Sequence, residues 1–238
     1  MSNHQILNTN DHAELRVHTG ASADRGDAVM AALAVPEEFR KLQAHYPIVF
    51  RRDDKGNFSA LALFGFENGE NLFLQGENWD AAYRPLSIDI QPFLFGRPAS
   101  GEGDGQVHVD MDHPRISPNG EGTRVFDATG RATPYLEGIA DKLGLLHSAF
   151  EASGAFFAAL ARYELLEPFT LNVPLSDGSK QALVGFHIID EAKLRSLDGE
   201  ALGALHAEGH LMPIFMSLAS LSHFTDLIAR KEAKLARG

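Results

Sequence analysis

Histidine and aspartate residues in two parts of the sequence could together bind iron. His108 and Asp110 are separated by one residue, and alternate residues of a strand point to the same side of a sheet. Two histidines and one carboxylate form the facial triad that holds Fe(II) in oxygenases. His187 would supply the third ligand, and Arg195 would hold an acidic cosubstrate. The alternative is that His108 lies in a surface turn and binds no metal. We favour this alternative, because a match of only three residues can arise by chance in a chain with 11 histidines.

Carboxylates near the same predicted strand could serve general acid–base chemistry or calcium binding. Asp110, Asp112 and Glu121 are close in sequence, but they lack the spacing of an EF-hand loop. The alternative is that these carboxylates cap the loop around Pro114 and that Arg115 pairs with one of them. We favour loop capping.

Two histidines near the C-terminus have the spacing of zinc ligands on one helix face. His206 and His210 are four residues apart, but Gly209 interrupts them and the glutamate of a metalloprotease helix is missing. This pattern favours histidines at a helix boundary. The sequence also lacks a serine elbow, a phosphate-binding loop and a complete dinucleotide fingerprint. We therefore expect no cofactor and no metal.

Aromatic residues offer a different kind of site. Trp79 is the only tryptophan, and Tyr83 follows four residues later. They could line an exposed groove for a peptide or a sugar, with Asp110, Asp112 and Arg115 supplying polar groups. These five residues are the predicted ligand-binding residues. The alternative is that both aromatic side chains cover the core, and this reading is physically simpler.

Alternating apolar runs separated by turn residues predict the strands that position these residues. Residues 47–50, 58–66 and 71–75 predict a three-stranded meander, with Asn-Gly at 68–69 as the second turn. Further strands are expected at 88–95 and 107–111. Residues 169–175 and 181–189 flank an Asp-Gly turn and predict a hairpin.

Helical spacing begins at Thr133-Pro134, a favourable helix start. Apolar residues then recur every three or four positions to residue 160, on one long helix or two. Asp190 and Asp198 are expected to cap two short helices, and a last helix is expected from residue 210 to the basic C-terminal end.

Composition excludes several classes of protein. The 238 residues carry a formal net charge of −11, so nucleic acid is an unfavourable partner. The chain has no cysteine, which excludes disulfides and thiol chemistry. No segment has the roughly 18 apolar residues of a membrane span. The apolar run at 28–35 lacks the basic region of a signal peptide, so it predicts a buried strand or short helix and a cytoplasmic protein.

Blocks of residues along most of the chain resemble the SapC family of bacterial proteins. The blocks lie in the family's order between about residues 35 and 230. They are Tyr46-Pro47-Ile48-Val49-Phe50, Gly69-Glu70-Asn71-Leu72-Phe73, Trp79 with Tyr83 and Pro85, Asp110-x-Asp112-x-Pro114-Arg115, Leu165-Leu166-Glu167-Pro168, Asp177-Gly178, Gly185-Phe186-x-x-x-Asp190 and Gly209-x-Leu211-x-Pro213-Ile214.

The resemblance implies a role beside bacterial surface-layer systems and assigns no catalytic residues. Family members usually have other residues at the positions of His108 and His187, which weakens the iron interpretation. We expect a non-enzymatic binding or accessory protein with a protein or peptide partner. The alternative is an Fe(II)-dependent oxygenase that uses His108, Asp110 and His187.

The expected fold is α+β in a single domain. Residues 1–26 are polar and predict a poorly ordered arm, and residues 27–238 form the domain. A mostly antiparallel sheet from residues 46–126 and 169–189 packs against helices from 134–163 and 190–236.

Overall fold

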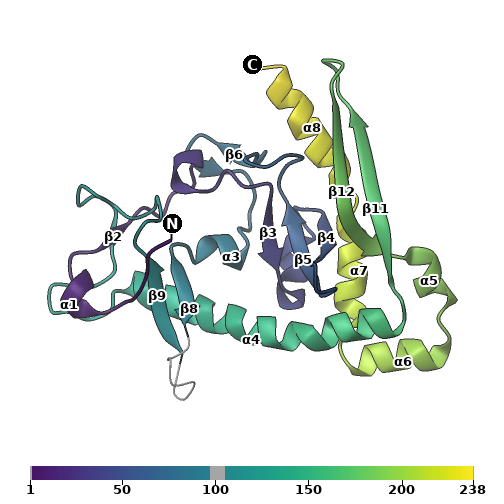
Figure 1. Ribbon diagram of the computed structural model, residues 1–238, viewed down its shortest axis with the longest axis horizontal. Coiled ribbons are helices and arrows are strands. Elements are labelled where there is room, and N and C mark those ends of the chain that lie inside the picture. Colours follow the sequence, from purple (N-terminus) through teal and green to yellow (C-terminus); the bar gives the residue numbers. More distant parts are fainter. Residues whose placement is uncertain (1, 97–104, 238) are drawn as a thin grey trace. The chain divides into compact units, whose positions relative to one another are not determined.

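The structure is a computed structural model that describes residues 2–96 and 105–237. It confirms the predicted α+β class, because its strands form antiparallel sheets and the chain after residue 189 is helical (Figure 1). The chain divides into two compact units. Unit 1 comprises residues 1–28, 74–79 and 86–148, and unit 2 comprises residues 29–73, 80–85 and 149–238.

A five-stranded antiparallel sheet forms the centre of unit 2, with the strand order β11-β12-β4-β5-β3. The apolar run at 28–35 was predicted to form a buried strand or a short helix, and it contains the strand β3. The hairpin β11–β12 is confirmed, with its turn at Asp177-Gly178. The strands are Ala31–Ala34 (β3), Ile48–Arg52 (β4), Phe58–Leu63 (β5), Leu166–Pro174 (β11) and Lys180–Ile189 (β12).

Aromatic rings fill the core between this sheet and its helices. Phe39 of α2 (Phe39–Leu42) lies edge-on to Phe50 of β4 at 6.5 Å and to Phe156 of α4 (Pro134–Arg162) at 6.0 Å between ring centroids. All three side chains are fully buried. Edge-to-face packing adds to the free energy that each ring gains by leaving water. α2 continues from a short 3-10 helix, η2 (Pro36–Glu38).

Four helices follow the hairpin in unit 2. The Asp190 and Asp198 carboxylates cap the first two as predicted, because they accept the N–H groups of Lys193 and Ala201. The predicted last helix is two helices that break at residues 221–222. Figure 1 shows both of these running along the β11–β12 hairpin. The helices are Glu191–Ser196 (α5), Gly199–Ala207 (α6), Leu211–Ser220 (α7) and His223–Leu235 (α8).

The prediction that residues 71–75 form the third strand of the meander is wrong. Leu74–Gln75 (β6) pairs with Asn78–Trp79 (β7) in unit 1, and β3 takes the place beside β5. The reason lies at Glu70, which is buried. Its carboxylate accepts the N–H of Phe66 at 3.1 Å and the Lys231 ammonium at 2.8 Å. These contacts hold the segment against α8 instead of in a strand.

Unit 1 contains a three-stranded antiparallel sheet with the order β1-β9-β8. Gln106–Asp110 (β9) is the strand predicted at 107–111, and it lies between His4–Ile6 (β1) and Phe93–Gly96 (β8). The predicted strand at 88–95 is only partly confirmed, because Leu86–Asp89 forms a helical turn, α3, and β8 begins after Pro92.

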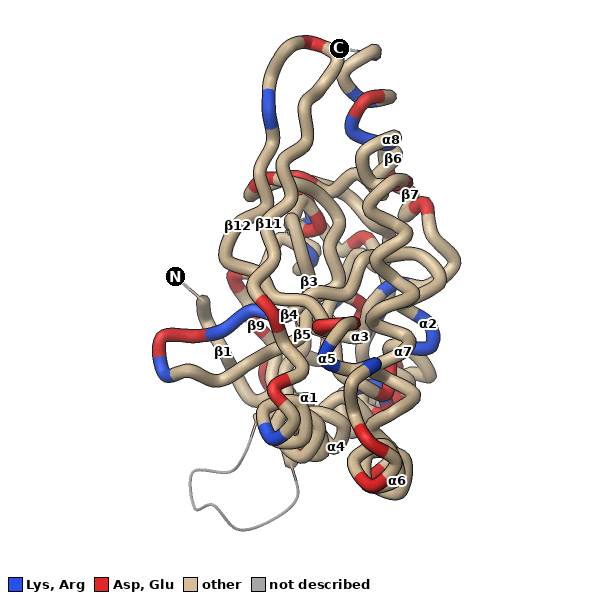
Figure 2. The backbone as a smooth tube through the Cα atoms, turned by 90° about the vertical axis from the view of Figure 1, so that its right-hand side faces the viewer, with Lys and Arg blue, Asp and Glu red and all other residues tan. Residues whose placement is uncertain are grey.

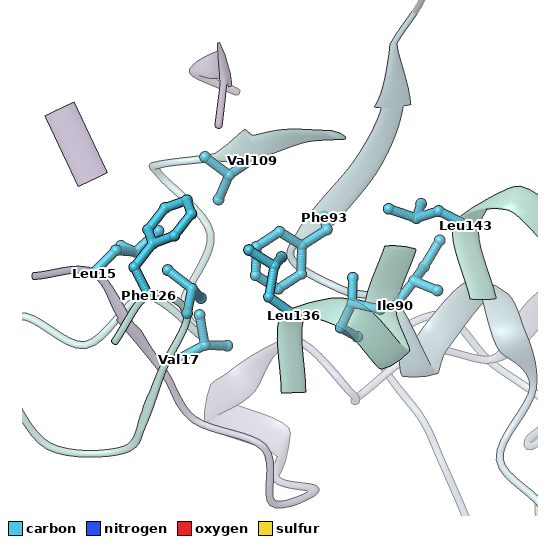
Figure 3. Packing of buried hydrophobic residues seen from close by; sticks show 10 residues of the cluster. Leu15, Val17, Ile90, Phe93, Val109, Phe126, Leu136 and Leu143 are labelled. Atoms are coloured by element: carbon cyan, nitrogen blue, oxygen red, sulfur yellow. The ribbon is translucent and has the colours of Figure 1, made fainter. Parts of the chain in front are cut away.

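Ten apolar residues form the core cluster of unit 1. Figure 3 shows how side chains from the N-terminal segment, β8, β9 and α4 converge on it. α4 is one continuous helix of 29 residues, and its first half supplies Leu136, Ile139 and Leu143. The cluster is Leu15, Val17, Ile90, Phe93, Val109, Val125, Phe126, Leu136, Ile139 and Leu143.

The N-terminal segment is more regular than its polar composition predicts. Besides β1, it contains Thr9–His12 (α1), Arg16–Val17 (β2) and a 3-10 turn at Ala23–Arg25 (η1). β2 pairs with Thr123–Arg124 (β10), and Leu15 and Val17 are buried. Strand pairing and two buried apolar residues thus dock a segment whose average composition is typical of a loose arm.

Two helical stretches are long and apolar enough to cross a membrane by length and composition alone. They are Pro134–Arg162 and Leu211–Leu235, and a third of the most apolar window of each is buried. This differs from the expectation that no segment qualifies. Core helices of soluble proteins pass the same test, so length and composition alone do not assign a membrane span to either stretch.

Candidate functional site

An open, mostly apolar pocket with a volume of about 370 Å³ lies on unit 1. β1, the start of β9, the turn at 126–132 and the first two turns of α4 line it. Its volume falls in the range of small-ligand sites. The described lining residues are Ile6, Leu7, Gln106, Val107, Phe126, Ala132, Leu136, Glu137 and Ala140.

Local backbone contacts hold the walls of the pocket in place. The N–H of Leu7 donates to the carbonyl of Val107 at 2.9 Å, which fixes the chain after β1 against β9. Phe126 and Ala132 face each other in an isolated β-bridge that closes the turn before α4. Thr133 follows this turn, and α4 begins at the next residue, as its Thr-Pro pair predicts.

The pocket has an apolar floor and two polar groups at its edge. Phe126 and Leu136 are buried, whereas Gln106 and Glu137 are exposed. Among the residues that the structure describes, none pairs with the Glu137 carboxylate or with the Gln106 side-chain amide. This pattern of apolar surface with few polar groups is typical of binding sites.

The structure does not assemble the proposed iron triad. His108 and Asp110 lie on β9 as predicted, but His187 lies on β12 in unit 2. Within residues 2–96 and 105–237, no group of three or more His, Asp or Glu residues is placed to hold a metal ion. The His108 ring instead covers Gly96, where an added Cβ would lie 2.2 Å from it. The oxygenase alternative therefore has no support.

Asp110 serves the turn that follows β9. Its Oδ1 atom accepts the N–H of Asn3 at 2.8 Å and the N–H of Asp112 at 3.2 Å. Partial burial works to raise the pKa of Asp110, but these hydrogen bonds and the nearby His4 outweigh it and hold the pKa below its usual value. Asp112 and Glu121 are exposed, so the carboxylates do not converge on one buried point.

Arg115 is buried and fully engaged on its two terminal nitrogens. Nη2 donates to both carboxylate oxygens of Asp27, at 2.6 and 2.7 Å, and Nη1 donates to the carbonyls of His18 and Gly20. The prediction that Arg115 pairs with a nearby loop carboxylate is wrong in its partner, because Asp27 is 88 residues away in the sequence. Burial and the adjacent guanidinium also lower the pKa of His113.

The two predicted aromatic residues fall in different units. Trp79 lies on β7 in unit 1, opposite Leu74, and is partly exposed. Tyr83 belongs to unit 2, where its hydroxyl donates to the buried Glu38 carboxylate at 2.7 Å and its carbonyl accepts the hydroxyl of Tyr46. The Tyr83 ring is thus held in place by the fold of unit 2.

The two histidines spaced four apart do not act as a pair. His206 is exposed near the end of α6, whereas His210 precedes α7 and packs edge-on against Phe156 at 5.7 Å. Both stand at helix boundaries, as the glycine between them predicts.

Sequence reasoning missed the pocket because its walls come from four separate segments. No motif links them, and most of the lining residues are apolar. The one available signal is Glu137, an acidic residue beside the buried Leu136. An acidic residue in the first turn is also the ordinary complement of a helix dipole, so this signal alone predicts no site.

Comparison with models of protein families matches residues 7–227 to the family described as SapC. No curated protein and no solved structure gives a significant match. The match covers nearly the whole chain, including most of both units and every described lining residue of the pocket except Ile6. The chain belongs to the SapC family.

Proposed function

We propose that this protein is a non-enzymatic binding or accessory protein of a bacterial cell-envelope or surface-layer system. The observation that carries the proposal is the open apolar pocket of unit 1 with two polar side chains at its edge. The system follows from the resemblance of the sequence to a family named after a surface-layer locus. A protein or peptide partner and a cytoplasmic location belong to the same proposal.

The chemistry of the pocket favours binding over catalysis. An enzyme site brings together a nucleophile or a base, a group that orients it, and donors that stabilise developing charge. Among the described lining residues, Glu137 is the only one that titrates, and Gln106 is the only other polar side chain. A single exposed carboxylate and an amide can orient a ligand, but they do not form an acid–base pair.

Site-specific photo-crosslinking tests the proposal in cells of a bacterium that carries this gene. A photoreactive phenylalanine analogue replaces Ile6, which is 50% exposed on β1 and lines the pocket. The matched control replaces Val184, which is 65% exposed on β12 of unit 2. We expect a discrete adduct from position 6 that position 184 does not give.

A competing variant makes this test specific for the pocket. Ala140→Phe places a ring in the pocket from an exposed helix position, so it should reduce the adduct from position 6. Identical adducts from positions 6 and 184, or an adduct that Ala140→Phe leaves unchanged, would contradict the proposal.

A further inference from the structure

We infer that the unit 1 pocket takes an amphiphilic cation, an apolar chain or ring that ends in an ammonium or guanidinium group. This inference rests on the proposed binding function and names the chemical class of its ligand. Two features of the pocket carry it: the size and apolar character of the floor, and the sign of the charge at the edge.

The floor accounts for the apolar part of the ligand. Phe126, Leu136, Val107 and Leu7 come from four separate segments of unit 1 and leave a space of about 370 Å³. A small apolar group that enters this space removes its own surface and that of the floor from water, which is the main source of affinity in such sites. The open mouth leaves one end of the ligand near solvent, where a charged group keeps part of its hydration.

The polar residues at the edge of the pocket favour a positive charge at the solvent-facing end of the ligand. Glu137 supplies a carboxylate and Gln106 an amide oxygen, and both accept hydrogen bonds. No lysine or arginine is among the described lining residues, so none of these residues offers a cation to an anionic ligand. The net charge of −11 adds a field of the same sign, and Figure 2 shows acidic residues in many segments of the described chain, interspersed with basic ones. A cation is therefore favoured over a neutral or anionic ligand of the same shape.

The Glu137 carboxylate is available to pair with a cationic ligand. Its backbone N–H is engaged with the carbonyl of Thr133 inside the helix start, so the residue itself is held in place. Its side chain has no ion pair with any residue that the structure describes. Asp141 provides the comparison: it is exposed on the same helix one turn later, but it does not line the pocket.

A titration with three probes of equal length tests the inference. The probes are hexylammonium, hexan-1-ol and hexanoate at millimolar concentration, and amide shifts in ¹H–¹⁵N spectra of the full chain locate binding. We expect hexylammonium to bind most tightly and to shift amides of residues 6–7, 106–107 and 136–140. Glu137→Gln should weaken hexylammonium about threefold, the size of an exposed ion pair, and leave hexan-1-ol unchanged. Asp141→Asn should change neither.

The outcomes separate this inference from the proposed function. Equal binding of all three probes at the pocket would overturn the cation inference and leave the binding function standing. No shift at the pocket with any probe, or shifts that Ala140→Phe does not abolish, would overturn both. N-acetyl-lysine methylamide distinguishes the source of the cation. Binding as tight as that of hexylammonium supports a lysine side chain of a peptide, and tighter binding of hexylammonium supports a free amine.

Discussion

Replacement of Arg115 by methionine should strongly destabilise unit 1. The Arg115 and Asp27 side chains are 3% and 2% exposed, and Asp27 also accepts the N–H of Ser22 at 2.8 Å. Loss of the guanidinium leaves a carboxylate charge inside the protein and removes the donor to two backbone carbonyls. Breaking a buried ion pair on one side costs about 3–5 kcal/mol. The ratio of folded to unfolded molecules should therefore fall by about two to four orders of magnitude.

Denaturant unfolding followed by tryptophan fluorescence measures this loss. Trp79 is the only tryptophan and lies in unit 1, so its emission reports on the unit that contains the ion pair. Arg25→Met is the matched control. Arg25 pairs with Glu77 at 3.0 Å, but Glu77 is 75% exposed, and exposed pairs contribute about 1 kcal/mol or less.

A second variant isolates the role of charge. Asp27→Asn combined with Arg115→Met removes the buried negative charge, so the double variant should be more stable than Arg115→Met alone. The reasoning is refuted if Arg115→Met costs no more than Arg25→Met. In that case the ion pair does not stabilise unit 1, and the prediction that Arg115 is a ligand-binding residue is favoured again.

The ion pair between Lys231 and Glu70 and the two aromatic residues give further predictions. Burial works to raise the pKa of Glu70, but hydrogen bonds from Lys231 and backbone outweigh it and lower the pKa below 4.5. Because the folded pKa is depressed, this pair stabilises the protein above about pH 4.5, and the free energy of unfolding should fall as the pH drops below that value. Lys231→Met should cost about 3 kcal/mol at pH 7 and weaken this acid dependence, both measured by denaturant titration across pH. Tyr83→Ala should cost about 3 kcal/mol by the same measurement, because it leaves the buried Glu38 without its hydroxyl donor and opens a cavity; a cost below 1 kcal/mol would make Tyr83 a surface group. Trp79→Phe should lower affinity for a recovered partner if Trp79 is a ligand-binding residue, and should lower the melting temperature alone if it covers the core.

Local patterns predicted the elements whose signals lie within a short stretch of chain. The Thr133-Pro134 start and the three-and-four spacing after it mark α4, and Asp-Gly at 177–178 marks the β11–β12 hairpin. In each case the turn or cap residue and the apolar pattern favour the same structure. Agreement between such independent signals is what makes a local prediction reliable.

Pairings between distant segments could not be predicted in this way. Asn-Gly at 68–69 is a strong hairpin signal, yet Glu70 pairs with Lys231, which is 161 residues away. The strand that completes the sheet beside β5 is β3, and it comes from an apolar run that precedes the predicted meander. A strand edge accepts any partner of suitable pattern, so the choice between them is made by tertiary contacts.

The same distinction applies to the candidate site. The predicted ligand-binding residues included Asp110, Arg115 and Tyr83, because polar and aromatic side chains can contact a ligand. In the structure, each of these side chains is hydrogen-bonded to a partner within the fold. A group whose hydrogen bonds are already made gains little from a ligand, since new contacts must replace existing ones. Glu137 and Gln106 have no such partners among the described residues, and they stand beside an apolar floor. In the proposed function, the ligand is therefore held by polar groups that the fold does not use. Sequence patterns alone do not distinguish these groups from the polar groups that the fold does use.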